Sequence, residues 1–477
     1  MYMYNRKHLF LFYITALGCT FSNAHADSQD QARKLYSSLT GVNPTANEVN
    51  IIASKIASGR AMEAARDIVD SQNGIDSKGS FYSVTVKNFA TPWTNVDYTK
   101  MYPLTDLTAT VVGWVRDEKQ FNKILYGDSV YIASGITMAG NVVTTSLTNS
   151  LPLLYSTNKT SCEGVPVCTF CKSPSTVNGR LLFIDPANPN STQKLCRFTS
   201  MTESDFKAGV GSNNYYIPVT DSRLSTNLIK HTNAMYEEME TQNLDLSNPR
   251  ILVEKSQAVR LHQDEKAISG IMTLRAWGNA NYTAGTNRRS FQSTMKHLFC
   301  KEMMEINDTN TPDLRVRRDV DRSPGGTSGT FKALCVGCHA VMDAHAGAYA
   351  YYSFPAGAIQ YQQGVVVSKM NHNALWTKGF ITQDDSWINL SNFGQNASFG
   401  WGPQTEGNGL NSLAQMYSET KEFHKCMAKT VFKTVCHREA HSESDKNLVK
   451  SLALNYEEDN FNMKKLFMNT SIACMGK

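Results

Sequence analysis

The stretch FKALCVGCHAVMD, residues 331–343, contains two cysteines and a histidine at the spacing Cys335-Val-Gly-Cys338-His339. In c-type haem attachment two thiols add across the two vinyl groups of one haem, and the histidine that follows becomes the proximal ligand of the iron. Two intervening residues place the sulfur atoms about one helical turn apart. The alternative is a disulfide-type pair that precedes an unrelated histidine by chance. With 11 cysteines and 11 histidines among 477 residues, chance produces this pattern rarely. We therefore expect one covalent haem c, held by Cys335, Cys338 and His339.

The N-terminus has the features of an export signal. A basic pair at residues 6–7 precedes the apolar run LFLFYITAL, which is too short for a transmembrane helix, and Ala24-His25-Ala26 offers a small-x-small cleavage site. We therefore expect residues 1–26 to be a signal peptide and the protein to be periplasmic or secreted in a bacterium. The alternative is a lipid anchor on Cys19 in ALGC, although this site lacks the usual leucine. The rest of the sequence predicts no transmembrane segment, because no other run reaches about 18 apolar residues.

Composition limits the function classes. The formal net charge is +5, and no basic run stands out, so nucleic-acid binding is not expected. A hydrophobic fraction of 41% is enough for ordinary cores, and the length suggests two to four domains.

The remaining cysteines predict a disulfide framework. After signal cleavage and haem attachment eight are left, and an even number in an oxidising compartment predicts four disulfides. Four of them fall within residues 162–196, where we expect two local bridges with the pairing left open. Cys168-Thr-Phe-Cys171 is followed by lysine, so a second haem and a zinc site are the less favoured alternatives there. The eight are Cys162, Cys168, Cys171, Cys196, Cys300, Cys426, Cys436 and Cys474.

Four regions follow the changes in pattern along the chain, and together they predict a mainly α protein. After the signal peptide, residues 27–130 form a helical N-terminal region, with Thr45 as a helix N-cap after a turn. Residues 131–255 are rich in Ser, Thr, Asn and Gly, and we interpret them as a disulfide-pinned loop and β insert with little helix. Residues 256–477 form a cytochrome c-like haem region with a long loop over 353–408 and helices at its end.

Individual helices are marked by apolar residues at helical spacing. The N-terminal face consists of Val49, Ile52, Ile56, Met62, Ala65 and Ile68, interrupted at Gly59. A helix over 288–306 presents Phe291, Met295, Leu298 and Met303 on one face. The stripe in KEFHKCMAKTVFKTVC indicates core packing and consists of Phe423, Met427, Val431 and Val435.

The same C-terminal helix restricts disulfide pairing. On a continuous helix Cys426 and Cys436 lie about 15 Å apart, whereas a disulfide needs Cα atoms within about 7 Å. We therefore expect these two cysteines to bond elsewhere, with Cys300 and Cys474 as partners.

Four segments in order resemble a family of exported bacterial proteins, common in planctomycetes and myxobacteria, that carry one c-type haem motif within regions of unassigned function. The segments are GIMTLRAWGNANYTAGTNRRSF, RRDVDRSPGG, CVGCHAVMD and FHKCMAKTVF. The resemblance covers about residues 260–477, extends more weakly to LTGVNPTANEV and DEKQFNKILYGD, and does not cover 131–255. The family usually shows Met-Asp-Pro-Leu-Gly after the haem histidine, whereas Ala-His-Ala-Gly follows Met342-Asp343 here. The resemblance implies a cytochrome c-like domain and supplies no substrate.

Several residues are candidates for the sixth ligand of the iron. Met370 and His372 follow the motif across a long connection that gives the chain room to cross the haem, and we choose Met370 because a thioether is a common partner of histidine in cytochromes. His372 and a five-coordinate iron are the alternatives. Met342 and His345 share the proximal helix, and Met416 is interpreted as core.

Arginines near the motif could bind the haem propionates, since guanidinium groups hold carboxylates bidentately. For any one of them, ordinary pairing with Asp319 or Asp321 is the favoured interpretation. The candidates are Arg288, Arg289, Arg317, Arg318 and Arg322.

These features together predict an exported monohaem c-type cytochrome that transfers electrons to a redox partner protein. One alternative is a haem enzyme of peroxidase type, with an open iron site and a distal acid/base group such as His372 or His345. Another is a surface or structural protein in which haem serves only as a folding staple. The sequence leaves open whether the protein is an enzyme.

Overall fold

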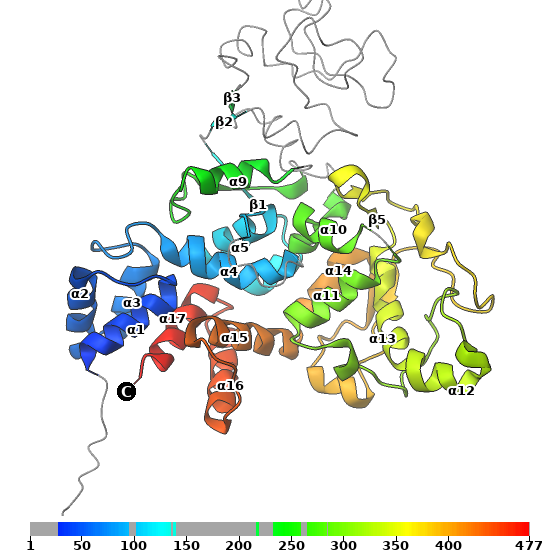
Figure 1. Ribbon diagram of the computed structural model, residues 1–477. Coiled ribbons are helices and arrows are strands. Elements are labelled where there is room, and N and C mark those ends of the chain that lie inside the picture. The colour runs from blue at the N-terminus through cyan, green and yellow to red at the C-terminus, as the bar shows by residue number, and fades with distance from the viewer. Residues whose placement is uncertain are drawn as a thin grey trace, which may run out of the picture.

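The computed structural model describes residues 27–94, 102–134, 137–139, 216–218, 232–258, 265–283 and 285–476. These residues are mainly helical, as predicted, and their strands form antiparallel pairs of two (Figure 1). Among them no helix is long and apolar enough to cross a membrane. The signal-peptide prediction, including the alternative at Cys19, lies outside the described residues.

The N-terminal region is helical, and its predicted start signal is confirmed. Thr45 caps the second helix with a capping box, in which its side chain accepts from the Glu48 amide and the Glu48 carboxylate accepts from the Thr45 amide. The interruption at Gly59 is also present, because its φ of +75° lies in the left-handed region. The helices are α1 Ser28–Thr40, α2 Ala46–Ala57, α3 Ala61–Val69, α4 Lys87–Ala90 and α5 Asp106–Arg116.

The predicted apolar face of α2 and α3 is confirmed at most positions. Val49, Ile52, Ala65 and Ile68 are buried. Met62 is the exception, since 44% of its surface is exposed. It stands in the first turn of α3, after the chain has changed direction at Gly59, so the periodicity of α2 does not carry into it.

Residues 131–133 and several residues within 234–252 belong to the same apolar core as the N-terminal helices. Strand β1 (Val130–Ala133) pairs with β4 (Leu252–Lys255) and lies against α5, and α9 (Ala234–Thr241) packs beside β1. A further pair joins β2 (Thr137–Ala139) and β3 (Tyr216–Pro218). The cysteine cluster at 162–196 and the alternatives weighed for Cys168 and Cys171 lie outside the described residues.

The second half of the chain supplies the helices around the CxxCH motif, and the long connection over 353–408 holds short strands and turns. The helices are α10 Arg275–Asn281, α11 Arg288–Leu298, α12 Ser328–Thr330, α13 Val336–Ala346, α14 Gly409–Ser418, α15 Lys421–Cys436, α16 Glu443–Glu458 and α17 Met463–Cys474. The strands are β5 Tyr352–Ser353 with β6 Gln360–Tyr361, and β7 Ser386–Ile388 with β8 Glu406–Asn408.

The helix predicted over 288–306 is shorter than expected. It ends at Leu298, because Cys300 adopts a left-handed conformation (φ 54°) and the Lys301 amide turns back to donate to the Met295 carbonyl. The next residues form only a short 3₁₀ turn, Met303–Glu305. The extension of the helix to residue 306 was therefore wrong.

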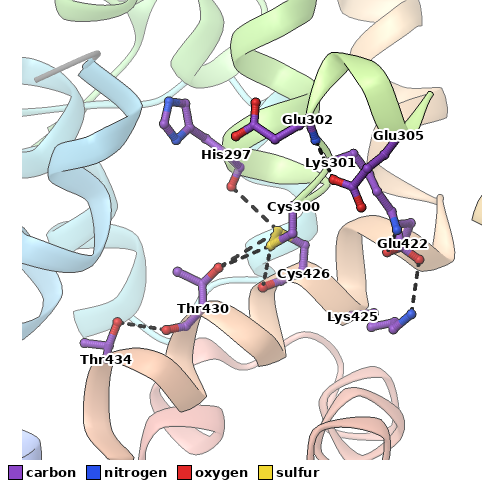
Figure 2. Close-up of a disulfide and its surroundings, with 10 residues drawn as sticks. All are labelled: His297, Cys300, Lys301, Glu302, Glu305, Glu422, Lys425, Cys426, Thr430 and Thr434. Atoms are coloured by element: carbon purple, nitrogen blue, oxygen red, sulfur yellow. Dashed lines mark hydrogen bonds and ion pairs between the residues drawn. A yellow bond between two sulfur atoms is a disulfide. The ribbon is translucent and has the colours of Figure 1, made fainter. Parts of the chain in front are cut away.

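Two disulfides connect the helices of the second half. Cys300 bonds Cys426 with the Cα atoms 5.4 Å apart, and Cys436 bonds Cys474 with the Cα atoms 5.6 Å apart. Figure 2 shows the first bridge, where Thr430 of α15 approaches both sulfur atoms. The expectation that Cys426 and Cys436 bond elsewhere is confirmed. The bridges join the end of α11 to α15, and the end of α15 to the end of α17.

Removing either bridge should destabilise the fold, because each constrains the unfolded chain. We expect a loss of about 2–4 kcal/mol in the free energy of unfolding for either paired Cys→Ser variant. The Cys300–Cys426 loop spans 126 residues and the Cys436–Cys474 loop 38, so the first loss should exceed the second by about 1 kcal/mol. Denaturant unfolding measures both, and a non-reducing peptide map that joins Cys300 to Cys474 would contradict this pairing.

Candidate functional site

The motif lies at the start of α13 and is held in place by a tightly packed loop. Cys335 immediately precedes the helix, and Cys338 and His339 lie in its first turn. Between them, Gly337 has no room for a side chain, because a Cβ would lie 1.7 Å from the Asn307 Oδ1 atom. The Asp308 amide also donates to the Gly337 carbonyl at 3.3 Å. The loop before the motif thus fixes the first turn of α13.

Both cysteines of the motif are free and partly accessible. Cys335 packs at the edge of a small apolar cluster that includes Phe331 and Val336. Cys338 Sγ lies 3.5 Å from the Met303 carbonyl oxygen. Burial, with a smaller contribution from Cys335, raises the pKa of the Cys338 thiol.

The imidazole of His339 presents one nitrogen to the protein and keeps the other available. Its Nδ1 atom is buried and has no hydrogen-bond partner among the described residues. The nearest acceptor is Asp343 Oδ2, one turn further along α13 at 3.6 Å, which exceeds hydrogen-bond length. The side chain remains 26% exposed. Nδ1 is therefore the ring nitrogen that faces the protein interior.

Asp343 is a buried carboxylate held by two arginines. Arg288 of α11 donates to it through Nε at 2.5 Å and Nη2 at 2.9 Å, and the Arg317 amide donates at 3.1 Å. Arg288 also forms a bidentate pair with Asp319, at 2.5 and 2.8 Å. Burial opposes ionisation of Asp343, but its contacts with His339 and Arg288 hold the pKa well below its usual range.

The surface beside the motif is hollowed and has polar and apolar parts. A depression of about 630 Å³ is lined by Thr309, Thr311, Pro312 and Asp313 on one side and by Gly329, Phe331, Lys332, Ala333 and Val336 on the other. Leu334, directly before Cys335, is 73% exposed, and Met304, next to the carbonyl that contacts Cys338, is 75% exposed. An apolar planar group attached to the two thiols would cover side chains that otherwise face water.

The residues predicted to complete the iron site are not brought to His339 in this structure. Met370 is buried in a separate cluster with Ala350 and Tyr351. Those residues lie beyond the end of α13 at Ala346 and beyond the short 3₁₀ turn Gly347–Tyr349 that follows it. His372 is exposed, with Nδ1 2.8 Å from the Lys369 carbonyl oxygen. Ligation by Met370 or His372 remains a prediction.

The other residues considered as iron ligands or as an acid/base group belong to the core. Met342 and Met416 are buried in the main apolar cluster. His345 is fully buried, with Nδ1 2.9 Å from the Tyr417 hydroxyl and Nε2 3.3 Å from Asn389 Oδ1. Burial lowers the pKa of His345 to about 4, although the Asn389 contact acts the other way. The neutral ring, accepting from Tyr417 and donating to Asn389, satisfies all three groups.

Of the arginines weighed for the propionates, most have other roles. Arg288 pairs with Asp319, as the favoured interpretation expected, and also with Asp343. Arg317 is buried and donates to the Thr286 carbonyl at 3.0 Å, and burial lowers its pKa to about 10. Arg322 donates to two backbone carbonyls and covers the Phe331 ring. Arg289 is exposed, and Arg318 is half-buried with Nε unpaired.

Asp343 is the site residue that sequence reasoning missed. It belongs to the Met342-Asp343 pair that the chain shares with the resembled family, and the sequence suggested no role for it. Its position four residues after His339 places both on one side of a helix, and that spacing was the available signal. The arginines that hold it come from distant segments, so their convergence could not be read from the sequence.

Acidification should weaken the fold through His345. The unfolded histidine has a pKa near 6.5, whereas in the fold it is about 4, so the unfolded chain binds more protons between these values. The stabilisation is complete above about pH 6.5 and is lost as the pH falls towards 4, by up to roughly 3 kcal/mol. A His345→Gln variant should lose less stability than the wild type between about pH 7 and 4.5 in urea unfolding. The exposed His372→Gln variant is the control, and an unchanged pH dependence in His345→Gln would contradict the prediction.

Comparisons with known proteins assign no family. Searches against protein-family models, curated proteins and solved structures find no match to this chain. In the part of the chain that the structure describes, no group of three or more His, Cys, Asp or Glu side chains is arranged to hold a metal ion. The case for a function therefore rests on the motif and its surroundings.

Proposed function

We propose that the protein is an exported monohaem c-type cytochrome, in which Cys335 and Cys338 attach one haem and His339 ligates its iron. One observation carries the proposal. The two motif cysteines are free and partly accessible and adjoin a partly exposed histidine, while the other four cysteines in the described residues are all paired in disulfides. Haem attachment requires two cysteines that are not in disulfides, because both thiols must react with the vinyl groups.

The residues around the motif fit this cofactor. When bound, haem c supplies an iron centre that exchanges one electron. The loop at Asn307 and Asp308 fixes the turn that carries both thiols. The buried Nδ1 of His339 leaves Nε2 for the iron. The exposed apolar side chains beside the motif give the porphyrin a hydrophobic surface to lie against.

Electron transfer is favoured over peroxidase chemistry by the position of the histidines. A peroxidase needs an acid/base group over the open face of the iron. Both ring nitrogens of His345 already have partners in the core, and His372 lies at the surface beside Lys369. The folding-staple alternative is also disfavoured, because the main apolar core extends from Ala32 to Met468 and includes neither motif cysteine.

Covalent attachment is the first test. The protein should be expressed with its leader in a bacterium that matures c-type cytochromes, and the purified chain should carry the mass of one haem after denaturation. Cys335→Ala with Cys338→Ala should abolish the added mass. Cys436→Ala with Cys474→Ala removes the same number of cysteines and should retain it. Haem that is extracted by acid-acetone, or no haem at all, would refute the proposal, and two haems would indicate a second attachment site.

The spin state tests the electron-transfer role. A six-coordinate low-spin iron with a weak far-red band in the oxidised spectrum would indicate a methionine ligand. Met370 is the predicted ligand, so we expect Met370→Leu to remove the band and the exposed Met304→Leu to retain it. A band that survives in Met370→Leu would exclude Met370 as the ligand. A high-spin spectrum that changes at once with peroxide would favour the enzyme.

A further inference from the structure

We infer that Asp343 positions the haem ligand: its carboxylate accepts the Nδ1 hydrogen of His339, keeps Nε2 as the iron ligand and lowers the reduction potential of the iron. This inference rests on the proposed function and deepens it. The CxxCH motif does not include this carboxylate. The resembled segment CVGCHAVMD does include Asp343, but the resemblance assigns it no role.

The two side chains are already placed for the contact. His339 and Asp343 are one helical turn apart on α13, and Nδ1 lies 3.6 Å from Oδ2. Nδ1 is buried and has no other acceptor among the described residues. A small rotation of the half-exposed imidazole brings this pair within hydrogen-bond length, and an iron bond at Nε2 fixes the ring in its plane. Because Nδ1 then carries the hydrogen, only Nε2 offers a lone pair to iron.

The carboxylate is also held so that it cannot turn away. Its side chain is fully buried, Arg288 binds both of its oxygens, and the Arg317 amide adds a third donor. Oδ1 accepts one of these bonds and Oδ2 accepts two. Because a carboxylate has about four acceptor sites, the His339 hydrogen would take the free site on Oδ1 or share Oδ2 with its present donors. Asp319 holds the other side of the Arg288 guanidinium. The charged groups around Asp343 are therefore the guanidinium groups of Arg288 and Arg317, with Asp319 paired to Arg288.

The effect on the iron follows from charge. An anionic acceptor at Nδ1 makes the imidazole a stronger donor to the metal. Stronger donation stabilises the oxidised iron relative to the reduced iron, which lowers the reduction potential. A neutral acceptor in the same place also keeps the hydrogen of His339 on Nδ1. It makes the imidazole a weaker electron donor to the iron than a carboxylate does. The Asp343→Asn substitution replaces the anionic acceptor with a neutral one and hardly changes the shape of the side chain.

The test is a redox titration of the attached haem in wild type, Asp343→Asn and Asp319→Asn. We expect Asp343→Asn to increase the ratio of reduced to oxidised iron at a fixed potential about ten-fold, a shift of about 59 mV for one electron. Asp319→Asn removes a charge from the same Arg288 cluster without touching His339 and should shift the ratio much less. No change in Asp343→Asn, or equal changes in both variants, would overturn the inference.

A second measurement covers the case in which Asp343→Asn does not fold. In the wild type, the iron–histidine stretching frequency, recorded by resonance Raman after photodissociation of carbon monoxide from the reduced protein, reports the partner of Nδ1 directly. A high frequency, as a carboxylate partner produces, supports the inference, and a frequency typical of a neutral acceptor overturns it. A wild type without covalent haem would instead refute the proposed function, so the two failures are distinguishable.

Discussion

The bidentate pair between Arg288 and Asp343 is the interaction around which the candidate site is organised. It joins α11 to α13, the helix that carries the motif, and draws in Asp319 from the intervening loop. Burying charges is costly unless they are paired and hydrogen-bonded, and here each oxygen of Asp343 has a donor. Loss of either partner would leave an uncompensated charge inside the protein. The pair thus fixes both the orientation of α13 and the electrostatic surroundings of His339.

The rest of the fold supports this arrangement from a distance. The Cys300–Cys426 bridge attaches the end of α11 to α15, and Cys436–Cys474 attaches α15 to the last helix. In Figure 1, α15 and α17 lie between the N-terminal helices and the helices around the motif. One apolar core contains residues from both halves of the described part of the chain.

Local features were predictable from the sequence, and long-range ones were not. The Thr45 cap and the break at Gly59 depend on residues within a few positions of each other. The exclusion of a Cys426–Cys436 bond needed only helix geometry. In contrast, the early end of α11 depends on the left-handed turn at Cys300. The spacing of apolar residues in the sequence does not indicate this turn. Met370 was placed at the iron because of chain length, but its contacts with Ala350 and Tyr351 are decided by packing.

The most direct test of the account is the pyridine haemochrome spectrum of the denatured, acid-acetone-washed protein. Thioether bonds to both vinyl carbons shift the α band of the iron–pyridine complex to shorter wavelength than in free haem, independently of folding. The account predicts a haem c spectrum at one equivalent per chain, retained through the wash. A colourless pellet, or a band at the position of unattached haem, would contradict it.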